Sequence, residues 1–507
     1  MVSEVRLGTA AGRWVVAATV LGSGMAFLDS TVINIALPAI GHDLGTGLGG
    51  LQWTLDGYLL TLAALILLGG SLADRYGRRR VFIIGTVWFA LASLLCAVSP
   101  TIEVLVAARG LQGIGAALLT PVSLAILQTG LAPADRTRAI AAWSGLTGVA
   151  IAIGPVVGGW LIDVASWQWI FVINLPMAVA VVVVALRYIP ESRDPSPRGL
   201  DWIGALVGAV SLAALTYGFI RWGERGLGGL TGFAVAVGVV GLVVFVVVER
   251  RSPCPMLPPG LFTNRRFTGT NLVTLGLYAA LSSALFILVV RLQNELHYSP
   301  LAAGVATVPI TLLMLSGSDL AGRISNRIGP QLPLTVGPLV AGLGLALLGS
   351  VAPGSGYLTG VLPGLLVFGV GLTIVVAPLT ATVLAAADDA LAGIASGVNN
   401  AIARTGGLLG VAVVPLLAGG ASGTAYRYAM WITAGMAMVA GVVGFFSLAG
   451  SRPVPVEARA PEAQAPAGAE VPAGQPVGAQ ARPREFSCGA GAPPMRPAGV
   501  GTESGSV

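Results

Sequence analysis

Charged residues are scarce in this chain. Only 10% of its 507 residues are Asp, Glu, Lys or Arg, and lysine is absent, so all 28 basic residues are arginines. Hydrophobic residues make up 55% of the sequence. A composition this apolar lies far outside the range of soluble globular domains. The sequence therefore predicts a polytopic membrane protein.

Cysteine and histidine are also rare. The chain has three cysteines (Cys96, Cys254 and Cys488) and two histidines (His42 and His297), and none of them has the spacing of a metal site. Both histidines fall between the apolar runs, where loops outside the membrane are expected. A membrane-embedded enzyme would need a metal cluster or a nucleophile with its base. We therefore expect no metal, no cofactor and no enzymatic activity.

Long hydrophobic runs recur along the whole chain. About 20 apolar residues are needed to cross a bilayer as a helix. We predict fourteen spans, at 14–38, 51–73, 81–98, 102–125, 139–162, 169–189, 202–220, 230–248, 268–290, 303–324, 333–351, 357–380, 391–417 and 428–449. The first run is too long for the apolar part of a cleavable signal, so we expect it to remain in the mature protein.

The arginines predict the orientation of these spans. Short loops rich in positive charge are retained in the cytoplasm. With the N-terminus inside, most loop arginines fall on the cytoplasmic side, and only Arg221, Arg225, Arg291 and Arg427 fall outside. We expect both termini to be cytoplasmic, in the cytoplasmic membrane of a bacterium. The net charge of +6 follows from this topology and does not indicate nucleic-acid binding.

The two ends of the chain differ from the spans. Residues 1–13 are expected to form a short cytoplasmic N-terminus. Residues 451–507 are rich in Pro, Ala, Gly and Glu and lack periodic apolar residues. Such a segment cannot bury enough surface to fold, so we predict a disordered cytoplasmic tail.

An internal repeat appears when the chain is compared with itself at an offset of 252 residues. The matching positions are Gly70, Asp74, Arg75 and Gly77 with Gly322, Asn326, Arg327 and Gly329, and Gly154 and Gly158 with Gly406 and Gly410. This offset pairs the first six spans with the last six. We therefore predict an all-α protein of two six-helix bundles, at 14–189 and 268–449, with two inserted helices at 202–248. Parallel halves of this kind are typical of transporters.

Several segments together resemble a known family. Residues 70–79 are similar to the signature loop of the major facilitator superfamily, and residues 28–38, 109–115 and 148–159 resemble motifs of its drug:proton antiporters. The fourteen spans and residues 167–176 resemble the fourteen-span branch of those antiporters. The resemblance covers roughly residues 10–450 and implies the major facilitator fold.

The resemblance also implies a function. It implies a proton-coupled antiporter that exports amphipathic organic compounds such as antibiotics and drugs, driven by the proton gradient, and that confers resistance or self-resistance. Its partners would be protons, the lipid bilayer and a small amphipathic substrate, cationic compounds included, and we expect a monomer. A proton-coupled importer, or a narrow-substrate metabolite transporter of the same fold, is the alternative.

Two motifs receive conformational roles from the resemblance. The loop residues Gly70, Asp74, Arg75, Gly77 and Arg78 would form a latch between the halves, although Asn326 in the second copy would serve this role only weakly. The alternative is that these arginines only fix the topology. The group Gly154, Pro155, Gly158 and Gly159 would bend a helix at the contact between halves, as in exporters. Simple close packing of helices is the alternative there.

Asp29, Arg109 and Asp56 are charged residues inside apolar spans, which is costly and therefore suggests function. At about 1.5 Å of rise per residue, Asp29 lies about 22 Å above the inner end of its span, while Arg109 and Asp56 lie about 10 Å and 8 Å below the outer ends of theirs. These depths nearly coincide in a core about 30 Å thick. We expect the three residues to line one cavity in the outer half.

A carboxylate at that depth can exchange a proton for a substrate. Burial disfavours its charged form, and a neighbouring cation favours it. A cationic compound and a proton would therefore compete for Asp29 or Asp56, which is an antiport mechanism. A static ion pair of Asp29 with Arg109, and an interfacial position of Asp56, are the alternatives.

Three further residues are candidates for a substrate cavity: Asn34, Gln112 and Arg404. For Arg404, substrate contact, an anion site and helix packing all remain open.

Overall fold

The computed structural model describes residues 5–195, 199–352, 354–388, 391–419 and 423–449. Fourteen helices in this part of the chain are long and apolar enough to cross a membrane, which confirms the predicted number of spans. The predicted all-α class is also confirmed, because the described backbone contains no β-structure beyond one isolated bridge between Val5 and Leu131. The predicted disordered tail at 451–507 lies outside the described residues.

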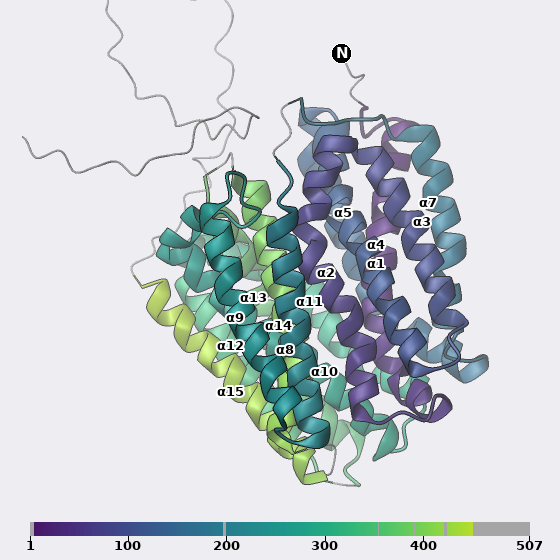
Figure 1. The fold of residues 1–507 in the computed structure, drawn as a ribbon, viewed down its shortest axis with the longest axis vertical. Helices are drawn as coiled ribbons and strands as arrows, with labels where there is room; N and C mark the ends of the chain where they lie inside the picture. Colours follow the sequence, from purple (N-terminus) through teal and green to yellow (C-terminus); the bar gives the residue numbers. More distant parts are fainter. Residues whose placement is uncertain (1–4, 196–198, 353, 389–390, 420–422, 450–507) are drawn as a thin grey trace, which may run out of the picture.

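The first six spans form one bundle (Figure 1). Its helices are α1 (Ala10–Asp43), α2 (Leu48–Tyr76), α3 (Arg78–Ala97), α4 (Ile102–Gly130), α5 (Pro133–Val164), and the pair α6 (Trp169–Val172) and α7 (Asn174–Tyr188), which together make the sixth span. The helix α4 lies between α2 and α3, and α1 packs against α5 and α7. We call this unit the N-bundle.

The last six spans form a second bundle, the C-bundle. Its helices are α10 (Arg265–Asn294), α11 (Pro300–Ile328), α12 (Gln331–Gly349), α13 (Leu362–Ala385), α14 (Ala392–Ala418) and α15 (Gly423–Ser447), with the short helix η1 (Pro259–Thr263) before α10 and a π-helical turn η2 (Tyr357–Val361) before α13. The gap between α12 and η2 confirms the predicted break between spans eleven and twelve.

Most helices are longer than the apolar runs that predicted them. The helix α1, for example, covers Ala10–Asp43, whereas the predicted span is 14–38, and it continues past Pro38. The extra turns at the helix ends are polar, so hydropathy alone misses them, but they still form backbone hydrogen bonds. Proline inside a membrane helix is tolerated because neighbouring groups compensate for the missing donor.

The two bundles touch mainly along two pairs of helices, α5 with α11 and α2 with α14, and α1 makes a smaller contact with α10. The offset of 252 residues relates α2 to α11 and α5 to α14, so it maps one of these contacts onto the other. The match extends to backbone detail. Both α2 and α11 end at a glycine with positive φ, Gly77 (φ 105°) and Gly329 (φ 89°), and each donates to the carbonyl four residues earlier. The sequence repeat is therefore a repeat of structure.

Hydrogen bonds join the two bundles on the side of the molecule opposite the N-terminus. We call this side the far face and the opposite side, at the top of Figure 1, the near face. The Gln52 amide donates to the Val411 carbonyl (2.6 Å), the Gln293 amide to that of Ile35 (2.8 Å), and the Leu301 backbone to Asp163 (3.2 Å). The bundles are thus tied together near the far face.

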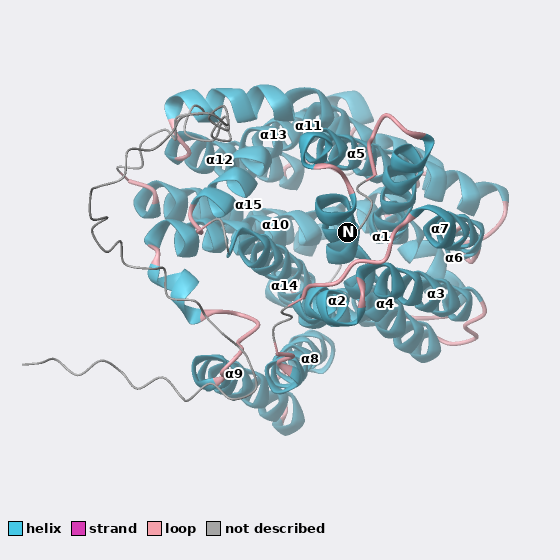
Figure 2. Cartoon of the chain, turned by 90° about the horizontal axis from the view of Figure 1, so that it is seen from above, coloured by secondary structure: helices cyan, strands magenta, loops and turns pink. Residues whose placement is uncertain are grey.

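The inserted helices α8 (Trp202–Arg225) and α9 (Gly229–Arg251) lie outside both bundles. The view along the helices shows them beside α2 and α14, at the seam between the bundles (Figure 2). The helix α8 packs against both α2 and α14, whereas α9 makes its extensive contact with α8. One side of α9 is therefore left without a helix neighbour.

Candidate functional site

Asp29 and Arg109 form an ion pair in the middle of the N-bundle. Asp29 comes from α1 and Arg109 from α4, and the distance from Arg109 Nη1 to Asp29 Oδ2 is 2.5 Å. The side chains are 2% and 1% exposed, respectively. The equal depths estimated from the sequence therefore correspond to direct contact. Removing two charges from water is costly, and this cost is recovered only when further hydrogen bonds satisfy both groups.

Gln112, Ser93 and Asn174 supply these further hydrogen bonds. The Gln112 side chain accepts from Arg109 (2.5 Å) and donates to Asp29 Oδ1 (2.8 Å) and to Ser93 Oγ (3.2 Å). Asn174 donates to the same Ser93 oxygen (2.9 Å) and to Asp29 Oδ1 (3.4 Å). Gln112 was expected in a substrate cavity, but the structure buries it in this network, three residues after Arg109 on one helix face.

Arg109 also contacts groups of α2 and α6. Its Nε donates to the Thr54 carbonyl (3.1 Å), and its guanidinium lies over the rings of Tyr58 (4.4 Å) and Phe171 (5.9 Å). Cation–π contact of this kind adds to the stabilisation of a desolvated arginine. The network thus joins five spans of one bundle and is fully enclosed, rather than lining a cavity between the bundles.

Asp56 is not part of this network. It is completely buried on α2, and neither of its carboxylate oxygens has a hydrogen-bond partner. It lies one turn after Gln52, which donates to α14, and three residues before Leu59, which packs at Gly407 of α14. The next residue, Gly57, faces α4 instead. By this spacing Asp56 lies on the side of α2 that faces α14 and α8. Asp29 and Arg109 are enclosed within the N-bundle, so the structure does not bring the three residues to one cavity.

A different face of α1 looks toward the C-bundle. Phe27 and Asn34 share this face, about half a turn away from Asp29, and both are partly exposed. The Arg404 guanidinium of α14 lies 5.7 Å from the Phe27 ring, and its Nε has no hydrogen-bond partner. The Asn34 amide donates within its own helix to the Ser30 carbonyl (3.1 Å). Arg404 and Asn34 are thus placed between the bundles, away from the Asp29–Arg109 pair.

The loop after α2 is held by the segment that follows α7. Asp74 pairs with Arg78 (2.6 Å), while the Arg78 backbone donates to the Ser192 carbonyl (2.8 Å). Glu191 accepts from the Arg79 backbone (3.1 Å) and lies 3.8 Å from the guanidinium groups of Arg79 and Arg80. Gly77 fits here because its positive φ disfavours any side chain.

The expected latch residues therefore sit together, but their described partners belong to the connection that leads to α8. Gly70 and Arg75 flank Asp74 on the last turns of α2. Within the described residues, Asp74, Arg75 and Arg78 make no hydrogen bond or ion pair to the C-bundle.

The glycine–proline motif of α5 lies at two helix contacts. Gly154 and Gly158 face α1, where a side chain would meet Thr31 and Val32. Pro155 and Gly159 face α11: the Pro155 backbone lies against Gly304, and a Cβ at Gly159 would approach the Pro300 carbonyl oxygen to 2.5 Å. Of the four residues that the resemblance placed at the contact between the halves, Pro155 and Gly159 lie there, whereas Gly154 and Gly158 pack within the N-bundle.

Replacing Gly159 by valine should force α5 and α11 apart. A side chain at this position meets backbone atoms, which cannot move aside, so we expect destabilisation of about 1–3 kcal/mol, typical of overpacking. Gly145→Val is the matched control on the same helix, because nothing lies within 4 Å of that position. Thermal unfolding in detergent measures both. Equal melting temperatures for the two variants would contradict the tight α5–α11 contact.

The described residues contain no group of three or more His, Cys, Asp or Glu side chains that could hold a metal ion. Cys96 is buried beside Gln112, Cys254 is partly buried, and both are free. Cys488 lies outside the described residues.

The sequence is similar to a known protein family and to several known transport and resistance proteins. The family model described as Major Facilitator Superfamily matches residues 19–411. The chain is 36% identical over 404 residues to the puromycin resistance protein pur8 of Streptomyces alboniger, covering 78% of this chain and 79% of that protein. It is 35% identical over 399 residues to the multidrug resistance protein Stp of Mycobacterium tuberculosis (strain CDC 1551 / Oshkosh), covering 78% of this chain and 74% of that protein.

A probable actinorhodin transporter of Streptomyces coelicolor (strain ATCC BAA-471 / A3(2) / M145) is 34% identical over 428 residues, covering 81% of this chain and 74% of that protein. Among solved structures, the peptide transporter POT in complex with sulfate superposes with a TM-score of 0.68 at 15% identity, covering 88% of this chain and 97% of that one. A D-xylose-proton symporter superposes with a TM-score of 0.61 at 14% identity, covering 86% of this chain and 98% of that one. These structures share the fold.

The family match over most of the chain, fourteen spans in two related bundles, and relatives that are drug-efflux and antibiotic-resistance proteins lead to one conclusion. The chain is a multi-pass transporter of the cell membrane, not an enzyme, and it belongs to the major facilitator superfamily.

Proposed function

We propose that this protein is a proton-coupled antiporter that exports amphipathic organic compounds, antibiotics among them, from the cell. The direction and the substrate class are supported by relatives whose names state resistance or export, including a tetracenomycin C resistance and export protein of Streptomyces glaucescens at 33% identity. The proton gradient supplies the energy. A potential of 100 mV contributes about 2.3 kcal/mol for each net charge moved inward, and the pH gradient alone drives the exchange of one proton for one cationic compound.

The observation that carries proton coupling is the buried, unpartnered carboxyl group of Asp56 at the seam between α2 and α14. Burying an ionised carboxylate without a partner costs several kcal/mol. Asp56 therefore becomes charged only while a cation or water lies beside it, and it holds a proton when the seam is closed. Because the seam joins the two bundles, a change in the charge of Asp56 acts directly on their contact.

The Asp29–Arg109–Gln112 network has a different role in this proposal. Both oxygens of the buried Asp29 side chain accept hydrogen bonds, and its charge is already paired with Arg109 in this arrangement. The network links α1 to α4 and holds α1 in a fixed rotation. This rotation presents Phe27 and Asn34 toward Arg404, and we place the substrate between these groups. Asp29 can exchange a proton only when the pair with Arg109 opens.

We place the near face in the cytoplasm. This face carries the arginine-rich turns that follow α2 and α4. It also carries the connection before α8 and the connection after α9. Loops rich in arginine are retained on the cytoplasmic side. The bundles are hydrogen-bonded near the far face, so the described conformation is one closed to the outside. This is the state in which an exporter receives its substrate.

Drug susceptibility and accumulation test the proposal. The protein should be expressed in a drug-sensitive bacterium that lacks its own exporters, and the uptake of ethidium and of puromycin measured with and without a protonophore. We expect lower accumulation than in cells with an empty vector, and loss of the difference when the protonophore is added. Higher accumulation would instead support import, and a difference that survives the protonophore would contradict proton coupling.

A further inference from the structure

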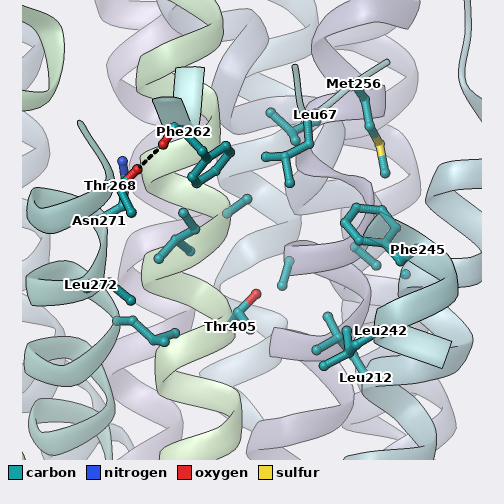
Figure 3. Close-up of a pocket in the computed structure, with 17 residues that line it drawn as sticks. Leu67, Leu212, Leu242, Phe245, Met256, Phe262, Thr268, Asn271, Leu272 and Thr405 are labelled. Atoms are coloured by element: carbon teal, nitrogen blue, oxygen red, sulfur yellow. Dashed lines mark hydrogen bonds between the residues drawn. The ribbon is translucent and has the colours of Figure 1, made fainter. Parts of the chain in front are cut away.

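A lateral pocket lies beside the seam, between the inserted helices and the C-bundle (Figure 3). We call it the lateral niche. Its walls come from α2, α8, α9, η1, α10 and α14, and one residue from each is, in that order, Ala63, Leu212, Phe245, Phe262, Leu272 and Thr405. Its volume is about 290 Å³. The niche occupies the space left because α9 packs on α8 and not on α10.

The niche lies in the half of the membrane nearest the near face. Figure 3 shows Phe262 and Met256 at its upper end, above Leu242 and Leu212. These two residues belong to η1 and to the connection between α9 and η1, which covers the pocket. The connection is held in place because the Leu257 backbone donates to the Glu249 carboxylate (2.9 Å). An occupant would therefore reach the niche sideways, from the bilayer between α9 and α10.

Three polar side chains line the niche, Thr268, Asn271 and Thr405, and the first two are hydrogen-bonded within the protein. The Thr268 hydroxyl donates to the Phe262 carbonyl (2.7 Å), as the dashed line in Figure 3 shows. The Asn271 amide donates to the Phe267 carbonyl (2.9 Å), and its oxygen accepts from Asn399 (3.0 Å). Small-molecule sites usually present a few free polar groups that orient the ligand, and their volumes are about 300–1,000 Å³. The niche suits a plain hydrocarbon chain better than a drug-sized molecule.

Exposed arginines flank the opening of the niche at the near face. Arg250 and Arg251 end α9, and Arg265 and Arg266 begin α10, the helices on either side of the opening. None of these four takes part in an ion pair within the described residues. Arg265 donates one hydrogen bond to the Phe446 carbonyl (2.8 Å). Basic groups at the membrane surface between helices attract anionic lipid headgroups.

We propose that the lateral niche binds an anionic phospholipid from the leaflet at the near face, with one acyl chain among Phe245, Leu212 and Leu242 and the phosphate at the arginines. The bound lipid touches α2 of the N-bundle, α10 and α14 of the C-bundle, and both inserted helices at once. It fills the side of α9 that no helix covers and fastens the inserted pair to the seam. The proposal depends on the position of the niche in the membrane and not on the direction of transport.

Photo-crosslinking tests the occupant. The photoreactive residue p-benzoylphenylalanine replaces Phe245, and the full chain is reconstituted into vesicles with phosphatidylcholine as the major lipid and phosphatidylglycerol as the minor one. After irradiation, intact mass identifies the attached lipid. We expect phosphatidylglycerol adducts enriched several-fold over their share of the bilayer. The same substitution at Val243, an exposed position of α9, should give adducts in the proportions of the bulk lipid.

Blocking the opening should remove this enrichment. Leu272 is 50% exposed at the mouth of the niche, and Leu343 of α12 is 51% exposed away from it, which makes Leu343→Trp a matched control for Leu272→Trp. Leu272→Trp should reduce the phosphatidylglycerol adduct at Phe245 several-fold, and Leu343→Trp should leave it unchanged. Identical lipid proportions at Phe245 and Val243, or adducts of added ethidium in place of lipid, would overturn the proposal.

A thermal measurement covers the case in which the photoreactive variants do not fold. A ligand that binds only the folded state raises the melting temperature. Phosphatidylglycerol added to the wild type in detergent should raise it by more than phosphatidylcholine does. Leu272→Trp should lose this difference and Leu343→Trp should keep it. Equal stabilisation by the two lipids in the wild type would count against a specific anionic lipid.

Discussion

Asp56→Asn should abolish gradient-driven export while the protein stays folded. Asparagine has the shape of the protonated acid but cannot release a proton, so coupling is lost at this position. A pH gradient equivalent to 100 mV supplies about 2.3 kcal/mol per proton, which corresponds to a concentration ratio of about 50 when one proton is exchanged for one ethidium cation. The variant should bring that ratio close to one. Uptake of ethidium into inverted membrane vesicles with an imposed gradient measures the change.

Stability separates this role from a structural one. Asp56 makes no hydrogen bond in the folded protein, so its replacement by a neutral side chain of equal size removes no contact. The melting temperature of Asp56→Asn should therefore equal or exceed that of the wild type. Asp319→Asn is the control, since Asp319 is 76% exposed and paired only with Arg323 at the surface. That control should export normally. Wild-type export by Asp56→Asn would remove Asp56 from the mechanism.

Arg109→Ala should be the most destabilising single substitution in the N-bundle. It leaves Asp29 buried with a charge and no cation, and breaking a buried pair in this way typically costs about 3–5 kcal/mol. It also removes the bonds to Gln112 and Thr54 and the contact with Tyr58. Thermal unfolding in detergent, with folded yield as a second readout, measures the loss.

A double-mutant cycle shows whether the charge itself is responsible. Asp29→Asn with Arg109→Gln removes both charges and keeps groups that can hydrogen-bond, so the double variant should be more stable than Arg109→Ala. Coupled residues in one network do not behave additively. If the losses from Asp29→Asn and Arg109→Gln simply added, the description of the pair as a mutually dependent unit would be contradicted.

The number of spans and the similar depth of Asp29 and Arg109 could be predicted from the sequence, because both depend on distance along a helix. The ion pair between them was only the alternative to the predicted cavity. Hydropathy gives the length of each run, and a rise of about 1.5 Å per residue gives the depth of each charge. The offset that matches Gly77 with Gly329 predicted the repeat for a similar reason, since glycine is favoured where φ is positive.

The face of each helix could not be predicted in the same way. Asp56 and Arg109 lie at similar depths, yet Asp56 is on the side of α2 toward α14 and α8, whereas Arg109 points into the N-bundle. The nearly uniform apolar spans carry no polar stripe that distinguishes these faces. Gln112 was assigned to a substrate cavity for this reason. Ser93 and Asn174 were missed because single polar residues in a membrane helix are common. The lateral niche depends on the space between α9 and α10, which no local pattern encodes.

Proton movement caused by substrate is the most direct test of the account. The purified protein is reconstituted into vesicles that enclose a pH-sensitive dye, with no gradient imposed, and ethidium or puromycin is added outside. Exchange of substrate for protons predicts a pH change inside that requires the substrate, and that is absent in Asp56→Asn but present in Asp319→Asn. Substrate transport by the wild type without any pH change would contradict proton antiport.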